Sequence, residues 1–185
     1  MAAGASADDG PGGDGLPFEW VRALAAAAHG EPGASPFVAA VPRWLERVEK
    51  TPQGLARWKS SLAALFLDVD ACSGALKSCP KLKELLQGVR QGREVLVRSR
   101  GRCLERQGGA SLAPELVAFA RKNFPSFVPD PSSMHGSNYR ECAEWMAAVH
   151  ELVPEECRKL LRRWKEAHPR RRNLWQALSA QGLPG

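Results

Sequence analysis

The sequence of 185 residues contains no isoleucine, and threonine and tyrosine occur once each, as Thr51 and Tyr139. β-Branched and aromatic residues favour β-strands, so their scarcity argues against a sheet. Part of this scarcity reflects base composition in the gene, because arginine outnumbers lysine by 18 to 8. No run of about 18 apolar residues occurs, and we therefore expect no membrane-spanning helix.

Motifs that carry enzymatic or cofactor chemistry are also missing. The sequence has no phosphate-binding G-x-x-x-x-G-K-[ST] loop, no dinucleotide-binding G-x-G-x-x-G turn and no G-x-S-x-G nucleophile elbow. His150-Glu151 begins like the H-E-x-x-H motif of metalloproteases, but Pro154 stands where the second histidine is needed. We interpret the close carboxylates of Asp68 and Asp70 as a solvated helix face. We therefore predict a protein that is not an enzyme, with no metal, cofactor or small-molecule substrate.

Five cysteines occur at positions 72, 79, 103, 142 and 157, none of them in a C-x-x-C pair. A zinc module needs ligands paired at short spacing, so the pattern predicts free thiols. Residues 1–15 hold three aspartates, no basic residue and no apolar run, so a secretory signal is not expected. An odd cysteine count without such a signal favours a reducing intracellular compartment, either the nucleus or the cytoplasm.

Apolar residues recur at steps of three or four from residue 16 onward, which is the spacing of an amphipathic helix. Helix starts are indicated where proline follows a capping residue, in Ser35-Pro36 and Thr51-Pro52, and again at Pro80 and Pro154. The sequence therefore predicts an all-α fold, a compact bundle of about seven or eight short-to-medium helices with a disordered N-terminal tail.

Breaks between these segments suggest the domain organisation. We expect Pro42 to break or kink its helix, and Gly101 and Gly108-Gly109 to end theirs. Whether the C-terminal segment packs on the same core is left open. The predicted parts are a disordered acidic, glycine-rich tail (1–15), a helical domain (16–124), a proline- and serine-rich linker or loop (125–137) and a C-terminal helical segment with a basic face (138–185).

The six tryptophans follow the apolar pattern. Five of them (Trp44, Trp58, Trp145, Trp164 and Trp175) lie at apolar-stripe positions, and Trp20 is one residue off. Tryptophans at this spacing are far more often core residues than a platform for stacking bases. We therefore expect them to be buried and ionic groups to form the surface.

Charge is segregated along the chain. The net charge is −3 over residues 1–15, +6 over 16–110, −4 over 111–157 and +7 over 158–185. On a helical wheel the first five basic residues of the last segment face away from Cys157, Leu160, Leu161 and Trp164, so one helix can pack into the core and show a cationic outer face. The candidate residues for binding a partner or phosphate are Arg158, Lys159, Arg162, Arg163, Lys165, Arg170, Arg171 and Arg172.

Two functions fit this pattern, beside the simpler reading of a solubilising helix face. The first is a non-enzymatic helical protein–protein interaction module, an adaptor or subunit of a larger complex, that docks an acidic protein surface through its charges. The spacing of Arg162-Arg163 and 170–172 also fits a bipartite nuclear import signal, which favours the nucleus. The alternative is a nucleic-acid-binding protein that uses the basic C-terminal helix and the Lys81–Arg106 segment.

Overall fold

The computed structural model describes residues 36–49, 55–90, 94–134 and 139–184. These residues form eight α-helices and two short 3-10 turns, with no β-strand among them, so the predicted all-α class is confirmed. The predicted tail at 1–15, the Thr51-Pro52 start and Trp20 lie outside the described residues. The elements are α2 (Pro36–Glu49), α3 (Leu55–Ser73), α4 (Pro80–Arg90), α5 (Glu94–Arg106), η2 (Gly109–Leu112), α6 (Ala113–Phe127), η3 (Pro131–Ser133), α7 (Arg140–Leu152), α8 (Pro154–Ala167) and α9 (Arg172–Ala180).

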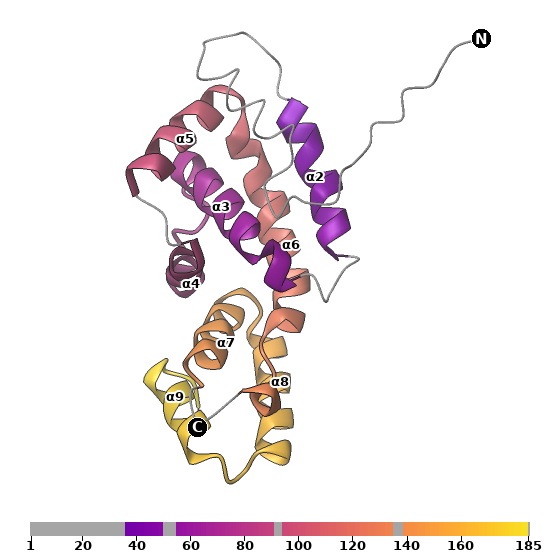
Figure 1. The fold of residues 1–185 in the computed structure, drawn as a ribbon, viewed down its shortest axis with the longest axis vertical. Helices are drawn as coiled ribbons and strands as arrows, with labels where there is room; N and C mark the ends of the chain where they lie inside the picture. Colours follow the sequence, from indigo (N-terminus) through magenta and orange to yellow (C-terminus); the bar gives the residue numbers. More distant parts are fainter. Residues whose placement is uncertain (1–35, 50–54, 91–93, 135–138, 185) are drawn as a thin grey trace, which may run out of the picture.

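The helices form an N-terminal group and a C-terminal group (Figure 1). In the first group α3 packs against α4, α5 and α6, while α2 lies against α6 and η2. In the second group α7 packs against both α8 and α9. Helix α4 joins the groups because it contacts α3 on one side and α7 on the other. The buried apolar residues form one cluster that runs from Val41 in α2 to Leu183 after α9.

An aromatic cluster links the two groups inside this core. The ring of Phe124 lies 5.7 Å from that of Phe66 in α3 and 5.5 Å from that of Trp145 in α7, measured between centroids. The Phe127 ring also packs on both Phe124 and Trp145. Tilted and edge-to-face pairs of this kind add to the free energy gained from burial, so α6 fixes α3 and α7 relative to each other.

Prolines mark helix starts as expected, but Pro42 does not break its helix. Helix α2 runs through Pro42 from Pro36 to Glu49, so of the expected break or kink the break is wrong. Proline inside a helix costs about 3 kcal/mol because a backbone hydrogen bond is lost. The apolar stripe on both sides of it, including the buried Val41 and Trp44, packs against α6 and η2 and offsets that cost.

Gly101 is also not the helix breaker that the sequence suggested. It is buried inside α5, where an added Cβ would lie 2.6 Å from the Cβ of Ala71 in α3. The glycine therefore serves the close approach of two helices and does not end one. Gly108 does follow the end of α5, and its φ of +75° is the left-handed conformation that glycine adopts readily.

The linker or loop that we expected to begin at residue 125 begins after Phe127 in the structure. Helix α6 includes Pro125 and ends at Phe127. The turn η3 follows, opened by the Asp130 carboxylate, which accepts hydrogen bonds from both the backbone N–H and the hydroxyl of Ser132. Pro131 is buried, so this part of the connection is packed against the body of the protein.

Candidate functional site

Helix α8 divides its residues between the core and the surface as the helical wheel predicts. Cys157, Leu161 and Trp164 are buried along one side of the helix. The positions between them carry the exposed basic residues Arg158, Lys159, Arg162, Arg163 and Lys165. The burial of the apolar stripe against α7 therefore directs five cationic side chains outward.

Three of the eight predicted site residues have intramolecular partners. Arg158 pairs with Glu155, and Lys159 pairs with Glu156 at 2.7 Å, both one turn apart on α8. Arg171 faces inward, which separates it from its neighbours in sequence. Its Nη1 donates to the carbonyl of Pro131 at 2.5 Å and to the Tyr139 hydroxyl at 3.1 Å. The Arg171 guanidinium also lies 5.8 Å from the centroid of the Tyr139 ring, so this arginine ties α9 to the η3 loop.

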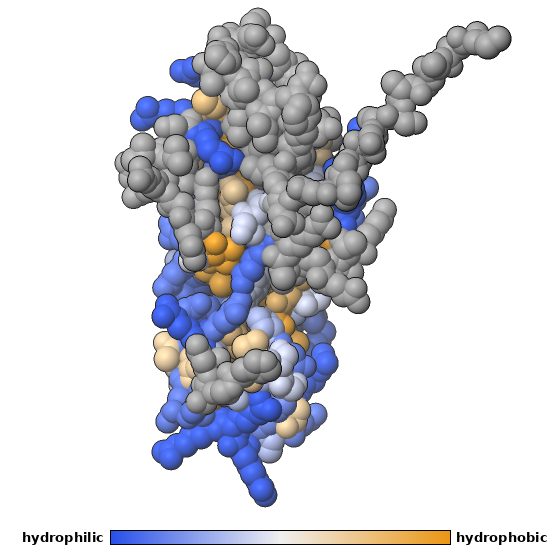
Figure 2. Space-filling model, viewed as in Figure 1, coloured by the Kyte–Doolittle hydropathy of each residue, from blue (hydrophilic) through white to orange (hydrophobic). Residues whose placement is uncertain are grey.

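The other five predicted residues are exposed cations at the α8–α9 end of the molecule, and we call them together the basic face. All five are exposed, and none makes a side-chain hydrogen bond or ion pair with any described residue. Three come from α8 and two flank the start of α9. Figure 2 shows that the end of the molecule formed by α8 and α9 is hydrophilic, with side chains that project into solvent. The basic face consists of Arg162, Arg163, Lys165, Arg170 and Arg172.

Among the tryptophans whose side chains the structure describes, Trp175 on α9 has an environment that differs from the expectation. Trp44, Trp145 and Trp164 are buried, whereas Trp175 is only half-buried. Its indole Nε1 donates to the carbonyl of His168 at 3.1 Å, which holds the ring against the turn between α8 and α9. The apolar pattern could not distinguish this residue, because position 175 follows the buried Leu174 and precedes the buried Leu178 on a short helix.

Two hollows are lined in part by Trp175, and both include basic residues. One has a volume of about 470 Å³ and is lined by Pro169, Arg170, Arg172, Trp175, Gln176 and Ser179. The other, which we call the slot, has a volume of about 270 Å³ and is lined by Arg158, Leu161, Arg162, Lys165, Trp175 and Pro184. An indole that lines two cationic hollows offers both an apolar surface and positive charge to a ligand.

The Lys81–Arg106 segment, which the nucleic-acid alternative requires, is partly neutralised by the molecule itself. Lys83 pairs with Asp70 and Arg100 pairs with Asp68, each at 2.7 Å. The Asp68 side chain has no exposed surface and Asp70 is 7% exposed, so the expected solvated face is wrong. The Asp70 carboxylate also accepts a hydrogen bond from the backbone N–H of Leu76 at 2.7 Å. Asp70 therefore holds the turn after α3 together, and Asp68 ties α3 to α5.

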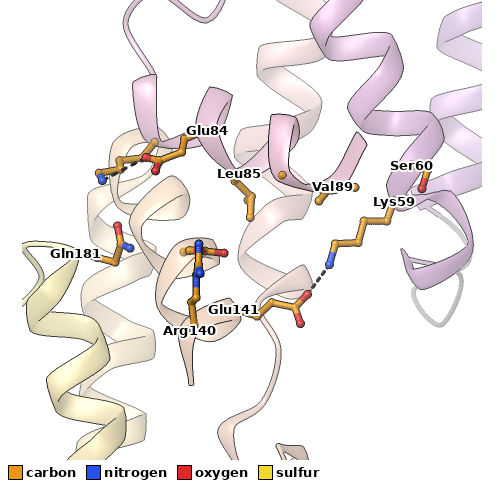
Figure 3. A pocket seen from close by; sticks show the side chains of 11 residues that line it. Lys59, Ser60, Glu84, Leu85, Val89, Arg140, Glu141 and Gln181 are labelled. Atoms are coloured by element: carbon orange, nitrogen blue, oxygen red, sulfur yellow. Dashed lines mark hydrogen bonds and ion pairs between the residues drawn. The ribbon is translucent and has the colours of Figure 1, made fainter. Parts of the chain in front are cut away.

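A larger groove of about 640 Å³ lies between α3, α4 and α7 (Figure 3). Its apolar floor includes Leu85 and Val89 of α4. Its rim carries three ion pairs, Lys59–Glu141, Lys81–Glu84 and Arg140–Glu144. Because each cation is matched by a carboxylate, the groove has no charge sign that would select a ligand.

The cysteines have the environment of packing residues. All five are free thiols, and burial raises the pKa of both Cys142 and Cys157 to about 11. Such thiols are weak nucleophiles and poor metal ligands at neutral pH. Within the described ranges no group of three or more histidine, cysteine or acidic side chains could hold a metal ion. None of the helices described there is long and apolar enough to cross a membrane.

Comparison with known proteins gives no relative from which a function could be transferred. No family model, no curated protein sequence and no solved structure matches the chain. The function must therefore be argued from the site alone.

Proposed function

We propose that this protein is a non-enzymatic helical interaction module that docks an acidic surface of a partner protein through the basic face. In this proposal it acts as an adaptor or a subunit of a larger nuclear complex. The observation that carries the proposal is that five exposed cations at the α8–α9 end of the molecule have no partner within the described parts of the chain. A cluster of unneutralised charge on ordered helices gives a partner both an orientation and a faster encounter.

The rigidity of the supporting helices strengthens this argument. The stripe of α8 packs against α7, and α9 is held to the body by Leu174, Leu178 and the Arg171 contacts. Unpaired cations on packed helices can contact the carboxylates of a partner without a large rearrangement of the backbone. Little conformational entropy of the backbone is then lost on binding.

Nucleic acid is the second candidate, and the half-buried Trp175 favours it. An indole beside arginines can stack on a base while the cations contact phosphates. This observation removes one argument against the alternative, namely that no aromatic ring is available. Two features still favour an acidic protein: the segment at 81–106 is partly neutralised by Asp68 and Asp70, and the slot beside Trp175 has aliphatic walls.

Zero-length carbodiimide crosslinking tests the protein proposal, because it joins a lysine amine to a carboxylate that it contacts. We expect Lys165 to crosslink to aspartate or glutamate residues of one partner protein in nuclear extract. The triple variant R162E/R163E/R170E should abolish the crosslink, while the control R121E, an exposed arginine on α6, should leave it unchanged.

Binding to defined nucleic acids at about 50 mM salt decides between the candidates, because phosphate contacts weaken steeply as salt rises. Tight binding to duplex or single-stranded DNA that the triple variant abolishes, together with no carboxylate crosslink at Lys165, would overturn the protein proposal. Absence of nucleic-acid binding at this salt concentration would remove the second candidate.

A further inference from the structure

The slot between α8 and α9 differs from the rest of the basic face in having an apolar interior. Leu161 and Trp175 supply it from α8 and α9, and Pro184 closes it after the last helix. Leu161 is 8% exposed, so it is accessible to a partner although it belongs to the core. The cations Arg158, Arg162 and Lys165 line the same slot, and no acidic side chain does.

We propose that the slot receives one large apolar side chain from an acidic peptide segment of the partner. This inference rests on the proposed function and specifies its ligand: a short segment rich in aspartate and glutamate with a leucine or an aromatic residue among them. The apolar side chain enters between Leu161 and Trp175. The flanking carboxylates meet Arg162 and Lys165 at the slot and Arg170 and Arg172 at the second hollow that Trp175 lines.

The size of the slot supports a single side chain as its occupant. Its volume of about 270 Å³ lies just below the range of roughly 300–1,000 Å³ that is typical of small-molecule sites. One anchored apolar residue inside a charged rim is also the usual arrangement at a protein interface, where a buried anchor supplies much of the affinity and the rim supplies orientation.

The chemistry of the walls favours an amino-acid side chain over a base. Leucine and proline offer neither a second ring for stacking nor hydrogen-bonding groups for a base edge. The hydrogen-bonding edge of the Trp175 indole is already engaged, because its Nε1 donates to the His168 carbonyl. The apolar interior of the slot therefore favours burial of apolar surface, and the hydrogen-bond donors of its lining are the cations Arg158, Arg162 and Lys165.

Titration with two synthetic peptides tests the proposal on the wild-type full-length protein. Both peptides carry the same acidic residues, and they differ only at the centre, which is leucine in one and serine in the other. The NMR signal of the Trp175 indole N–H, assigned with the variant W175F, reports binding at the slot. We expect the leucine peptide to bind about tenfold more tightly or better, and to shift this signal.

Variants then locate the effect. L161A removes part of the slot wall and should reduce the preference for leucine, with little effect on the serine peptide. L160A is the matched control, because Leu160 is half-buried on the same helix but does not line the slot. The wild-type comparison uses one protein and two ligands, so its result holds even if a variant fails to fold.

Three results would overturn the inference, and they separate its failure from that of the proposed function. Equal affinity for the two peptides, sensitive to R162E, would exclude the slot and leave the charged docking surface intact. Binding of the leucine peptide without a change at Trp175 would place its side chain elsewhere. Failure of both peptides to bind at millimolar concentration, with oligothymidylate shifting the indole signal, would reject the inference and the protein partner together.

Discussion

The carboxylate of Glu151, near the end of α7, lies over the first turn of α4, where its Oε2 accepts a hydrogen bond from the backbone N–H of Leu82 at 3.0 Å. Its Oε1 accepts from the N–H of Lys81 at the same distance. The first N–H groups of a helix have no partner within the helix, and the helix dipole favours an anion there. A side chain about seventy residues away thus caps α4 and fixes it against α7.

Replacing Glu151 by alanine should destabilise the fold. Two backbone donors lose their acceptor, and loss of a helix cap costs about 0.5–2 kcal/mol. Chemical denaturation followed by circular dichroism measures the change in the free energy of unfolding. The matched control is E155A, because Glu155 is exposed in the first turn of α8 and pairs with Arg158, where the helix dipole and a surface ion pair together contribute less than about 1 kcal/mol. Equal effects of the two substitutions would contradict the capping role.

The contact between Gly101 and Ala71 gives a second prediction. The variant G101A should destabilise the protein by about 1–3 kcal/mol, because the added methyl forces α5 away from α3. The control G88A places a methyl where no atom lies within 4 Å, and alanine is the better helix former by about 1 kcal/mol. It should therefore stabilise the protein slightly. Thermal unfolding of both variants measures the change in stability. A G101A variant as stable as the wild type would contradict the close approach of α5 to α3.

Helix periodicity made much of this fold predictable, because the relevant signals are local. Proline at the first helical position marks the starts of α2, α4 and α8, and the apolar stripe of α8 faces the core as expected. The errors arise where a partner distant in sequence decides the outcome. Gly101 resembles a breaker until Ala71 is placed against it, and Pro42 is tolerated because its helix is packed.

The candidate site was predictable in part for the same reason. The outward direction of the α8 cations follows from the periodicity of a single helix, so it can be predicted from the sequence. The inward direction of Arg171 depends on the Pro131 carbonyl and Tyr139, which lie 40 and 32 residues away along the chain. Likewise, the burial of Asp68 depends on Arg100 from another helix. No spacing pattern encodes such pairings.

A pH dependence follows from Asp130. Hydrogen bonds from Ser132 lower the pKa of this carboxyl in the folded protein. A lowered pKa stabilises the fold at pH values above the unfolded value of about 3.9, and the contribution is lost as the pH falls through the folded value. The wild type should thus be more stable than D130N at pH 6, and the difference should shrink toward pH 3. Urea denaturation at both pH values measures it, and a constant difference would contradict this account.

Thiol reactivity offers a fourth test. With a pKa of about 11, Cys142 and Cys157 are thiolates to the extent of about one part in a thousand at pH 8. Iodoacetamide should therefore modify them at least about a hundredfold more slowly in the native protein than in urea, because both thiols are also buried. Mass spectrometry of tryptic peptides gives the rates. Rapid native labelling at either position would show that the helices around α7 open readily.

The last prediction separates the roles of two adjacent arginines. Arg171 donates hydrogen bonds to Pro131 and Tyr139, whereas the exposed Arg170 makes no side-chain bond with the described residues. The variant R171A should lower the free energy of unfolding by about 1–3 kcal/mol, because hydrogen bonds from a charged group are lost and the Pro131 carbonyl keeps only the Met134 backbone N–H as a donor, at 3.4 Å. R170A should leave stability unchanged and weaken binding of the acidic peptides.

The two measurements must diverge for this assignment to hold. In thermal unfolding, R171A should have a lower melting temperature than R170A. At equal folded fraction, R170A should bind the acidic peptides more weakly than the wild type does. R171K is informative as well, because lysine keeps the charge but cannot reproduce the planar fork of donors, so it should rescue stability only in part. If R171A unfolds like the wild type while binding is lost, Arg171 belongs to the docking surface, and the η3 loop is held by other contacts.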